Sequence, residues 1–502
     1  PRSKNSSKWA SLSCEPALVM QFFAIQRIVG LLLTLFSITM VPPMLVSLHY
    51  DDGAVGAFII GAGVILSAGA ALWLPVARNR QELRLRDGFL VVVLFWVVLS
   101  LSASMPFLLL TSPEISVTDS IFEAASGLTT TGATVLTGID TLPESIRFYR
   151  QLLQWLGGMG IIVLAVAILP VLGIGGMQLY RAETPGPMKD NKLTPRITET
   201  AKALWYIYLS LTMACTLAYW AAGMTLFDAI GHAFSTVAIG GFSTHDASIA
   251  YFDSTLIEAI AVLFMGIAGV NFALHFVALR SRSGFAYLRD AEFKTYIGIV
   301  TAVAIIASLY LYASGTFTNL PEAFRYGVFQ TVSFSTTTGF TTTGYTAWPS
   351  FLPALLLFIS FIGGCAGSTG GGLKVIRVLL LFKQGFGEIL RLIHPSARIA
   401  IKVGGTPLPS RVVEAVWGFF AAYVVSFVFL MLCLMALGLD QVTAYSAVAA
   451  CLNNLGPGLG DVSANYGNIG DVAKILLSFA MMLGRLEVFT LLVILTPAFW
   501  RT

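Results

Sequence analysis

The chain has 502 residues, of which 56% are hydrophobic and 11% are charged. A soluble domain carries about 25% charged residues, so this composition excludes a soluble globular protein and indicates a polytopic membrane protein. The net charge of +4 gives no reason to expect binding to nucleic acid, because in a membrane protein the placement of the charges matters more than their sum.

The N-terminal part divides into a polar stretch and two apolar ones. Residues 1–19 are polar and rich in serine, with no periodicity, and we expect them to form a disordered extension ahead of Met20. The apolar segments Ile28–His49 and Val55–Val76 are each long enough to cross a bilayer. They predict an N-terminal transmembrane hairpin over residues 20–87.

The rest of the chain alternates long apolar stretches with short ones. The long stretches predict spans at Phe89–Leu110, Leu152–Leu172, Ala203–Leu226, Leu256–Ala278, Tyr296–Ala313, Leu352–Gly363 (a short one), Val412–Leu437 and Val472–Pro497. Between them lie apolar pieces too short to cross, which are typical of re-entrant half-helices: Asp119–Ser126, Asp228–Ser235, Pro321–Ser333 and Gln441–Cys451.

Each short piece ends in a stretch rich in glycine and threonine, and these stretches align as an internal repeat. The aligned glycines are Gly132, Gly241, Gly339 and Gly456, and a serine stands six residues before each of the first three. Each unit reads as a span, a half-helix, a polar loop and a second span. We expect these pore units over residues 88–202, 203–294, 295–411 and 412–502.

Lysine and arginine residues set the orientation of the spans. They concentrate in segments 78–86, 181–202, 280–294 and 374–411, and the alternate loops carry few. The positive-inside rule therefore puts both termini in the cytoplasm and opens all four polar loops to the outside.

Four loops of this kind on one face point to an ion filter. Non-helical backbone at membrane depth is tolerated only where protein buries it or where it lines a water-filled path. The four half-helices would direct the negative ends of their dipoles towards the membrane centre, which favours a cation. Backbone carbonyls and threonine hydroxyls would then replace the hydration shell of a monovalent ion.

The loops read GLTTTGAT, AIGGFSTH, STTTGFTTTGY and NNLGPGLG, and further motifs are RQLLQWLGGMG, GGCAGSTGGGLK and GRLEVF. In this order they resemble the TrkH/KtrB family of bacterial potassium-uptake proteins, from about Met20 to the C-terminus. The two extra N-terminal spans and Gly132 resemble the TrkH branch, since serine at that position goes with sodium permeation in some relatives.

The resemblance implies an all-α membrane protein in which one chain forms a pseudo-fourfold pore like that of a potassium channel. It also implies K⁺ as the transported ion, the bacterial inner membrane as the location, a homodimer in the lipid bilayer, and a cytosolic nucleotide-binding regulator of the TrkA type. No covalently bound cofactor is expected. Carried over position by position, the ion-binding residues are Thr130, Thr131, Gly132, Ile239, Gly240, Gly241, Thr337, Thr338, Gly339, Asn454, Leu455 and Gly456.

Two departures bear on selectivity. Ile239 stands where relatives often have threonine, but a backbone carbonyl does not depend on the side chain. The fourth loop has no threonine, and each loop has a single aligned glycine where tetrameric potassium channels have TVGYG. We therefore expect weaker discrimination against sodium than in a dedicated potassium channel.

A gate is predicted beneath the filter. The segment from Gly363 to Lys374 is rich in glycine; it lacks the adjacent Lys-Ser/Thr of a nucleotide-binding P-loop, and close helix packing is its simplest alternative role. Arg485 lies within the last apolar stretch, where a charge is expensive and marks a functional site. The predicted gate residues are Gly370, Gly371, Gly372, Lys374 and Arg485.

Other intramembrane polar residues have simpler expected roles. Glu123 and His232 occupy equivalent positions in the first two half-helices and would bond neighbouring helices. Asn271 and His275 lie on one face of a predicted span, and Glu487 would form a structural salt bridge.

Three other functions are alternatives to a potassium pore. An alternating-access transporter of a small polar solute usually has two repeats, and this chain has four. A sodium-permeable member of the same pore family is the second alternative. A membrane enzyme is disfavoured because the sequence lacks an HExxH motif, a nucleophile elbow and paired intramembrane carboxylates.

Overall fold

The computed structural model describes residues 20–79, 85–160, 197–396 and 399–501. These residues are almost entirely helical, and their one strand pairing joins β1 (Lys402–Val403) to β2 (Thr406–Pro407) in antiparallel register. Within these ranges six helices are long and apolar enough to cross a membrane, or up to eight if each of two bent pairs counts as one span. The prediction of a polytopic helical membrane protein is confirmed.

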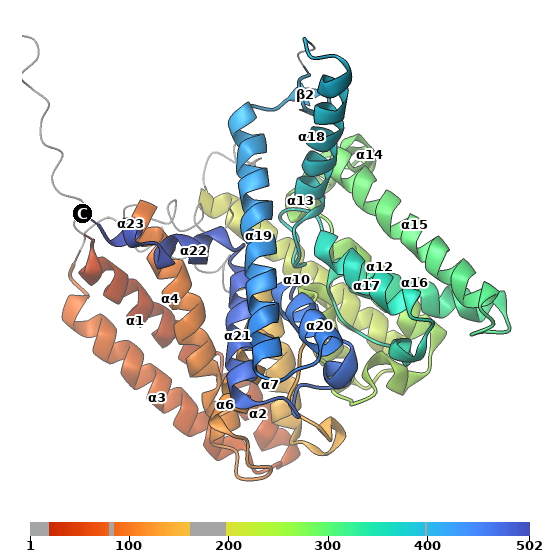
Figure 1. Cartoon of the computed structure of the whole chain (residues 1–502). Coiled ribbons are helices and arrows are strands. Elements are labelled where there is room, and N and C mark those ends of the chain that lie inside the picture. The colour runs from red at the N-terminus through yellow and green to blue at the C-terminus, as the bar shows by residue number, and fades with distance from the viewer. Residues whose placement is uncertain (1–19, 80–84, 161–196, 397–398, 502) are drawn as a thin grey trace, which may run out of the picture.

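The predicted N-terminal hairpin is present, but its first span differs from the prediction. It begins earlier, at α1 (Phe22–Ile38), and continues as α2 (Val41–Tyr50), which carries proline at its first turn. The second span is α3 (Val55–Trp73), and it packs along α1 in Figure 1. A Cβ atom on Gly30 would lie only 2.9 Å from the carbonyl oxygen of Gly69, so glycine brings the two backbones together.

Four units follow, each with a half-helix between two other helices. The first contains α4 (Leu85–Ala103), α5 (Met105–Leu108), α6 (Val117–Leu128), α7 (Glu144–Trp155) and a π-helical turn, Leu156–Gly160. The second contains α10 (Ile197–Ala221), α11 (Leu226–Ala238), α12 (Thr255–Ala268), α13 (Phe272–Ser281) and α14 (Phe285–Arg289). The third contains α15 (Ala291–Ala313), α16 (Leu320–Thr336), α17 (Phe351–Ile362) and α18 (Val375–Ile393). The fourth contains α19 (Ser410–Ala436), α20 (Gln441–Leu452), α21 (Asp471–Arg485), α22 (Phe489–Leu495) and α23 (Pro497–Trp500).

Local sequence explains where the half-helices α6, α11, α16 and α20 begin. The hydroxyls of Ser116 and Thr225 accept hydrogen bonds from backbone N–H groups in the first turns of α6 and α11. The carboxylate of Asp440 does the same for α20. These are preferred N-cap residues, whereas α16 begins instead with Pro321 in its first turn.

The units close into a ring because the helix after each loop packs against the half-helix of the next unit. In chain order, α7 contacts α11, α12 contacts α16, and α17 contacts α20. The last helix of the series, α21, then contacts α6 of the first unit. The pseudo-fourfold arrangement expected from the repeats is therefore present.

Two predicted spans are not continuous, which corrects the sequence interpretation. The stretch Leu256–Ala278 divides into α12 and α13, which meet at 93°. The side chain of Asn271 caps α13 by accepting a hydrogen bond from the N–H of Ala273, so Asn271 ends a span instead of lying on its face. The stretch Val472–Pro497 divides into α21 and α22 at 116°. Both breaks lie inside apolar runs, so hydropathy alone does not reveal them.

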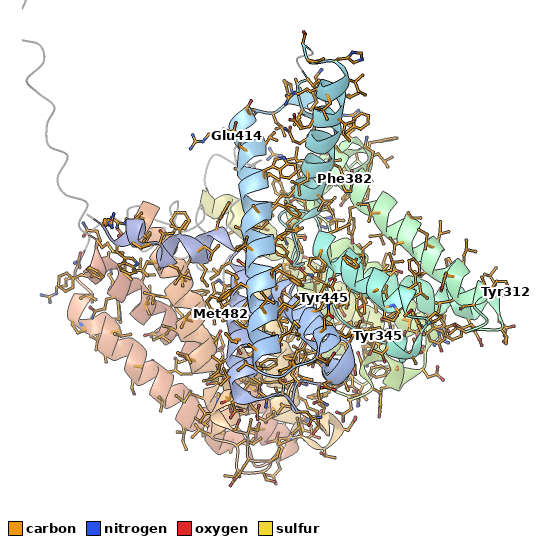
Figure 2. The ribbon with its side chains drawn as sticks, viewed as in Figure 1. Tyr312, Tyr345, Phe382, Glu414, Tyr445 and Met482 are labelled. Carbon is orange, nitrogen blue, oxygen red and sulfur yellow. The ribbon has the colours of Figure 1, made fainter. Side chains whose placement is uncertain are left out.

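The third unit breaks as expected, between α17 and α18. In Figure 1, α18 and the β pairing project beyond the other helices at the top. Figure 2 shows side chains along this projecting helix, among them Phe382, which is 75% exposed. The predicted extension 1–19 and much of the basic segment 181–202 lie outside the described residues.

Candidate functional site: an ion filter and the loop beneath it

The four polar loops share one backbone conformation. A positive φ is uncommon for residues other than glycine, yet it occurs at the same position of every loop, two residues before the aligned glycine: Thr130 (55°), Ile239 (55°), Thr337 (67°) and Asn454 (54°). The aligned glycines also have positive φ: Gly132 (80°), Gly241 (78°), Gly339 (84°) and Gly456 (94°). Sequence alignment of the loops therefore corresponds to structural equivalence.

The same hydrogen bond anchors each loop to its half-helix. The residue before the aligned glycine donates its N–H to the carbonyl five residues earlier, and three of these bonds measure 2.8 Å and one 2.9 Å. The pairs are Thr131 with Ser126, Gly240 with Ser235, Thr338 with Ser333 and Leu455 with Ala450. The filter peptide is thus tied to the C-terminal end of each half-helix.

The loops meet one another in a closed ring. A Cβ atom on Gly132 would lie 2.1 Å from the carbonyl oxygen of Gly240, in the next loop. The corresponding approaches in the remaining loops are Gly241 to Thr338 (2.0 Å), Gly339 to Leu455 (2.1 Å) and Gly456 to Thr131 (2.7 Å). Because the fourth approach returns to the first loop, the equivalent carbonyl groups surround one axis. Only glycine fits at these four positions.

The predicted filter side chains are buried, and hydroxyl groups pair within the ring. Thr131 lies 2.7 Å from Thr129, oxygen to oxygen, and Thr338 lies at the same distance from Thr336. The amide of Asn454 donates to the hydroxyl of Thr131 over 2.9 Å, so the loop without threonine is joined directly to the first loop.

The sequence interpretation missed a support on the outer side of the ring. The amide of Gln154, in α7, donates to the carbonyl oxygen of Gly240 over 2.6 Å and accepts from the N–H of Phe242 over 3.0 Å. Gln154 lies in the motif RQLLQWLGGMG, but the residues it contacts are far away in the chain. A glutamine within an apolar run was the one signal that marked it.

The glycine-rich loop between α17 and α18 lies against the third and fourth polar loops and against the C-terminal end of the half-helix α11. Gly371 donates its N–H to the hydroxyl of Thr337 over 2.7 Å, and Gly372 donates to the carbonyl oxygen of Asn453 over 3.2 Å. The hydroxyl of Thr369 donates to the carbonyl oxygen of Val237 over 3.0 Å. The predicted gate residues Gly370, Gly371 and Gly372 are therefore adjacent to the ring.

Two cationic side chains contact carbonyl oxygens of this loop. Lys374 is buried, and its ammonium group contacts the carbonyl oxygen of Gly370. Arg485 donates to the hydroxyl of Thr130 and to the carbonyl oxygen of Thr369, both over 3.2 Å, and to the carbonyl oxygen of Gly158 over 2.7 Å. Arg485 thus connects the first filter loop to the glycine-rich loop. It ends α21 at the helix break, and so does not lie in the middle of a span as the sequence indicated.

Glu487, two residues after Arg485, forms a salt bridge, as expected from the sequence. Glu487 forms an ion pair with Arg377 of α18, and the Arg377 guanidinium lies 4.2 Å from the ring centre of Phe419. This pair joins α18 to the break between α21 and α22.

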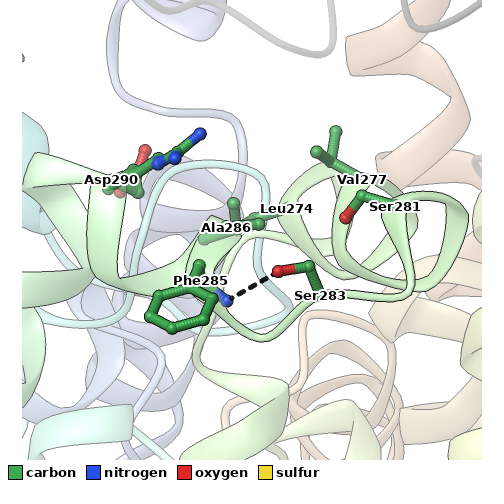
Figure 3. A pocket seen from close by; sticks show the side chains of 8 residues that line it. Leu274, Val277, Ser281, Ser283, Phe285, Ala286 and Asp290 are labelled. Carbon is green, nitrogen blue, oxygen red and sulfur yellow. Dashed lines mark hydrogen bonds between the residues drawn. The ribbon is translucent and has the colours of Figure 1, made fainter.

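A separate hollow of about 450 Å³ lies away from the filter residues. Figure 3 shows that residues of α13, α14 and the turn between them line it, and that the N–H of Phe285 donates to the hydroxyl of Ser283. Residues of the basic segment 280–294 form most of its lining, together with Leu274 and Val277, and the lining includes none of the predicted filter or gate residues.

Comparison with known proteins identifies the family. The family model of TrkH, described as a cation transport protein, matches residues 55–501. The chain is 61% identical over 485 residues to the Trk system potassium uptake protein TrkH of Vibrio parahaemolyticus, an alignment that covers 96% of this chain and all of the relative. It is 57% identical to TrkH of Escherichia coli K12 (96% of this chain, 100% of the relative) and 40% identical to TrkG of the same strain (94% and 97%).

The structural comparison agrees with the sequence comparison. The crystal structure of the potassium transporter TrkH from Vibrio parahaemolyticus matches with a TM-score of 0.88 at 59% identity, and the match covers 96% of this chain and 100% of that one. The chain therefore belongs to the TrkH family, whose members are cation transport proteins and not enzymes.

Proposed function

We propose that this protein takes up K⁺ across the bacterial inner membrane through a filter made of residues 130–132, 239–241, 337–339 and 454–456. The observation that carries the proposal is the closed ring of carbonyl groups, each beside an aligned glycine of the adjacent loop. The relatives described above are named potassium uptake proteins, which supports K⁺ as the ion.

The chemistry of the ring suits a dehydrated monovalent cation. Its carbonyl and hydroxyl oxygens are neutral donors that can replace water around the ion. The C-terminal ends of the four half-helices run into the loops, and each contributes a partial negative charge. The ring supplies attraction without a fixed full charge, so a cation can enter and also leave.

The gate is the loop that contains Gly370, Gly371 and Gly372, together with Lys374 and Arg485. Its contacts with the third and fourth polar loops and with the end of α11 support a blocking position directly beneath the filter. The guanidinium of Arg485 adds an electrostatic barrier to cations and holds the loop through the carbonyl of Thr369. Movement of the loop away from the ring would open the path.

The protein works as a homodimer in the bilayer, with both termini in the cytoplasm, and a cytosolic nucleotide-binding regulator of the TrkA type controls its gate. The name of the relatives, Trk system proteins, supports additional components. The basic segment 374–411, which includes the projecting helix α18, is the surface on which we expect the regulator to dock.

Growth on limiting potassium tests the function. In a bacterial strain that lacks its own potassium uptake systems, the wild-type protein should restore growth, and Gly132→Asp and Gly339→Asp should not. Gly344→Asp is the matched control, because a Cβ there meets no atom within 4 Å and the residue has a φ of −70°. Rescue by all three variants would contradict the pore.

Reversal potentials in vesicles separate the remaining alternatives. A K⁺-preferring pore predicts a reversal potential that follows the K⁺ gradient more closely than the Na⁺ gradient. A potential that follows Na⁺ equally would indicate the sodium-permeable relative. Saturable exchange without electrical current would indicate an alternating-access transporter.

A further inference from the structure

A buried ion pair lies behind the first two filter loops. Glu123 is in the half-helix α6, nine residues before Gly132, and Arg150 is in α7. The Nε of Arg150 donates to the Glu123 carboxylate over 2.7 Å, and the two side chains are 1% and 0% exposed. The sequence predicts that Glu123 bonds a neighbouring helix, and its ion pair with Arg150 of α7 is such a contact.

The carboxylate also holds the first filter loop. It accepts hydrogen bonds from the hydroxyl of Thr134 at 3.0 Å and from the N–H of Val135 at 3.1 Å. Thr134 lies two residues after Gly132, so this contact fixes the point where the first loop leaves the ring.

The guanidinium reaches both the first and the second loop. One Nη of Arg150 donates to the hydroxyl of Thr134, and the other donates to the carbonyl oxygen of Ser243, each over 3.1 Å. Ser243 lies two residues after Gly241, so it is the equivalent of Thr134 in the second unit. The planar fork of arginine therefore joins equivalent positions of adjacent loops, a geometry that the single charged group of lysine does not reproduce.

The other units lack this pair at the equivalent half-helix position. His232 stands there in the second unit and contacts the hydroxyl of Ser243 at 2.9 Å. Gln330 in the third unit has no hydrogen-bond partner for its amide within the described part of the chain, and the fourth unit has Ala447. The Glu123–Arg150 ion pair therefore supports the ring only between the first and second loops.

We infer that Glu123 and Arg150 are positioning residues that hold the first and second filter loops at the separation that distinguishes K⁺ from Na⁺. The inference rests on the proposed function. Neither group touches the ion, and both act through the loop backbone at Thr134 and Ser243. Charges this deeply buried are stable only while fully paired, so the pair resists the inward collapse of the loops that a smaller ion would require.

The test measures ion selectivity in vesicles containing the purified full-length protein. Glu123→Gln and Arg150→Lys should each lower the permeability ratio of K⁺ to Na⁺ by about fivefold or more, the effect of roughly one lost hydrogen bond on a difference in binding. Thr134→Val removes the hydroxyl that both residues contact, leaves the ion pair in place, and should lower the ratio in the same direction.

A second ion pair supplies the matched control. Arg325 of α16 donates to both carboxylate oxygens of Glu258 in α12, at 2.7 and 2.8 Å, near the start of a half-helix and away from the loops. Glu258→Gln should lower the thermal stability and leave the permeability ratio unchanged.

The outcomes separate this inference from the proposed function. If the wild-type protein prefers K⁺ and Thr134→Val retains the wild-type ratio, the positioning role is wrong while the potassium pore stands; Thr134→Val decides this even where Glu123→Gln fails to fold. An equal loss of selectivity in Glu258→Gln would also overturn it, since any weakened packing would then suffice. A wild-type protein without K⁺ conductance would instead contradict the proposed function.

Discussion

Arg485 connects three separate parts of the chain with one side chain. Its guanidinium donates to the hydroxyl of Thr130 in the first polar loop, to the carbonyl oxygen of Thr369 in the glycine-rich loop and to the carbonyl oxygen of Gly158 at the end of the π-helical turn. Arginine stays protonated in proteins and offers five donors in a rigid fork. The residue therefore provides a permanent positive charge and a mechanical link at the same place.

Replacing Arg485 with alanine should raise basal cation flux, because both the barrier and the link to Thr369 are removed. Uptake of Rb⁺ into vesicles, compared at equal protein, measures the effect. Arg485→Lys keeps the positive charge and loses the forked guanidinium, so its Rb⁺ flux should lie between that of the wild type and that of Arg485→Ala. Arg391→Ala is the control, since Arg391 is a largely exposed cation paired with Glu388. Unchanged flux in Arg485→Ala would remove Arg485 from the gate.

His245 lies among carboxylates where the first and second polar loops meet. Its ring contacts Asp140, lies 3.3 Å from the Asp228 carboxylate, stacks on Tyr251, and faces His232 at 6.5 Å between ring centres. Burial opposes its charged form, but the two carboxylates outweigh burial and raise the pKa of His245 above its ordinary value. This contact joins the first loop region to the second.

A raised pKa in the folded state means that protonated His245 stabilises the protein at low pH. The contribution is fully present below the unfolded pKa of about 6.5 and is lost as the pH rises through the folded pKa. The midpoint of thermal unfolding, measured from pH 5.5 to 8.5 in detergent, should therefore fall more steeply for the wild type than for His245→Gln. Parallel curves would show that the pair contributes no pH dependence.

The breaks of α12–α13, α17–α18 and α21–α22 contact one another through the glycine-rich loop. Cys365 of this loop donates its N–H to the carbonyl oxygen of Gly269 over 2.8 Å, and Arg485 donates to the carbonyl oxygen of Thr369. The Glu292 carboxylate of α15 accepts from the N–H groups of Ala366 and Ile376, at 2.7 and 3.1 Å. Glu292 thus binds the glycine-rich loop at Ala366 and the start of α18 at Ile376. The glycines between these two contacts can adopt backbone angles that other residues rarely adopt.

A glycine-to-alanine substitution, which adds one methyl group, tests how closely the glycine-rich loop packs against the polar loops. In Gly371→Ala the Cβ would lie 1.9 Å from the carbonyl oxygen of Asn453, so the loop must move away from the ring and basal Rb⁺ flux should rise. Gly385→Ala, in helix α18, is the control because no atom lies within 4 Å of its Cβ. That variant should leave flux unchanged and stabilise the helix by up to about 1 kcal/mol. Equal flux in both variants would show that the loop does not block the path.

Ion pairs near the starts of half-helices, away from the polar loops, join units that are distant in sequence. Lys474 of α21 and Asp119 of α6 form an ion pair of 2.6 Å that joins the fourth unit to the first. Arg325 and Glu258 join the third unit to the second. The contact between α21 and α6 closes the ring, so its loss should weaken the assembly of the four loops together.

The two partners of the closing pair should not be equivalent. The Lys474 side chain is 6% exposed and that of Asp119 is 26% exposed. Asp119→Asn leaves a buried ammonium group without its charge partner and should lower the free energy of unfolding by roughly 1–3 kcal/mol. Lys474→Met leaves only a partly hydrated carboxylate and should cost less. Denaturant titration of the purified variants compares them, and the reverse order would contradict the argument.

The sequence alone determined the membrane environment, the four half-helices and the aligned glycines. Each of these follows from properties within a short stretch of chain: the length of an apolar run, an N-cap residue such as Ser116, or a glycine at a repeated position such as Gly132. The tertiary structure decided the closure of the ring, the breaks in the second and fourth units and the roles of Gln154 and Arg150. These depend on pairs such as Gln154 and Gly240, 86 positions apart, and such contacts exist only once packing brings distant segments together.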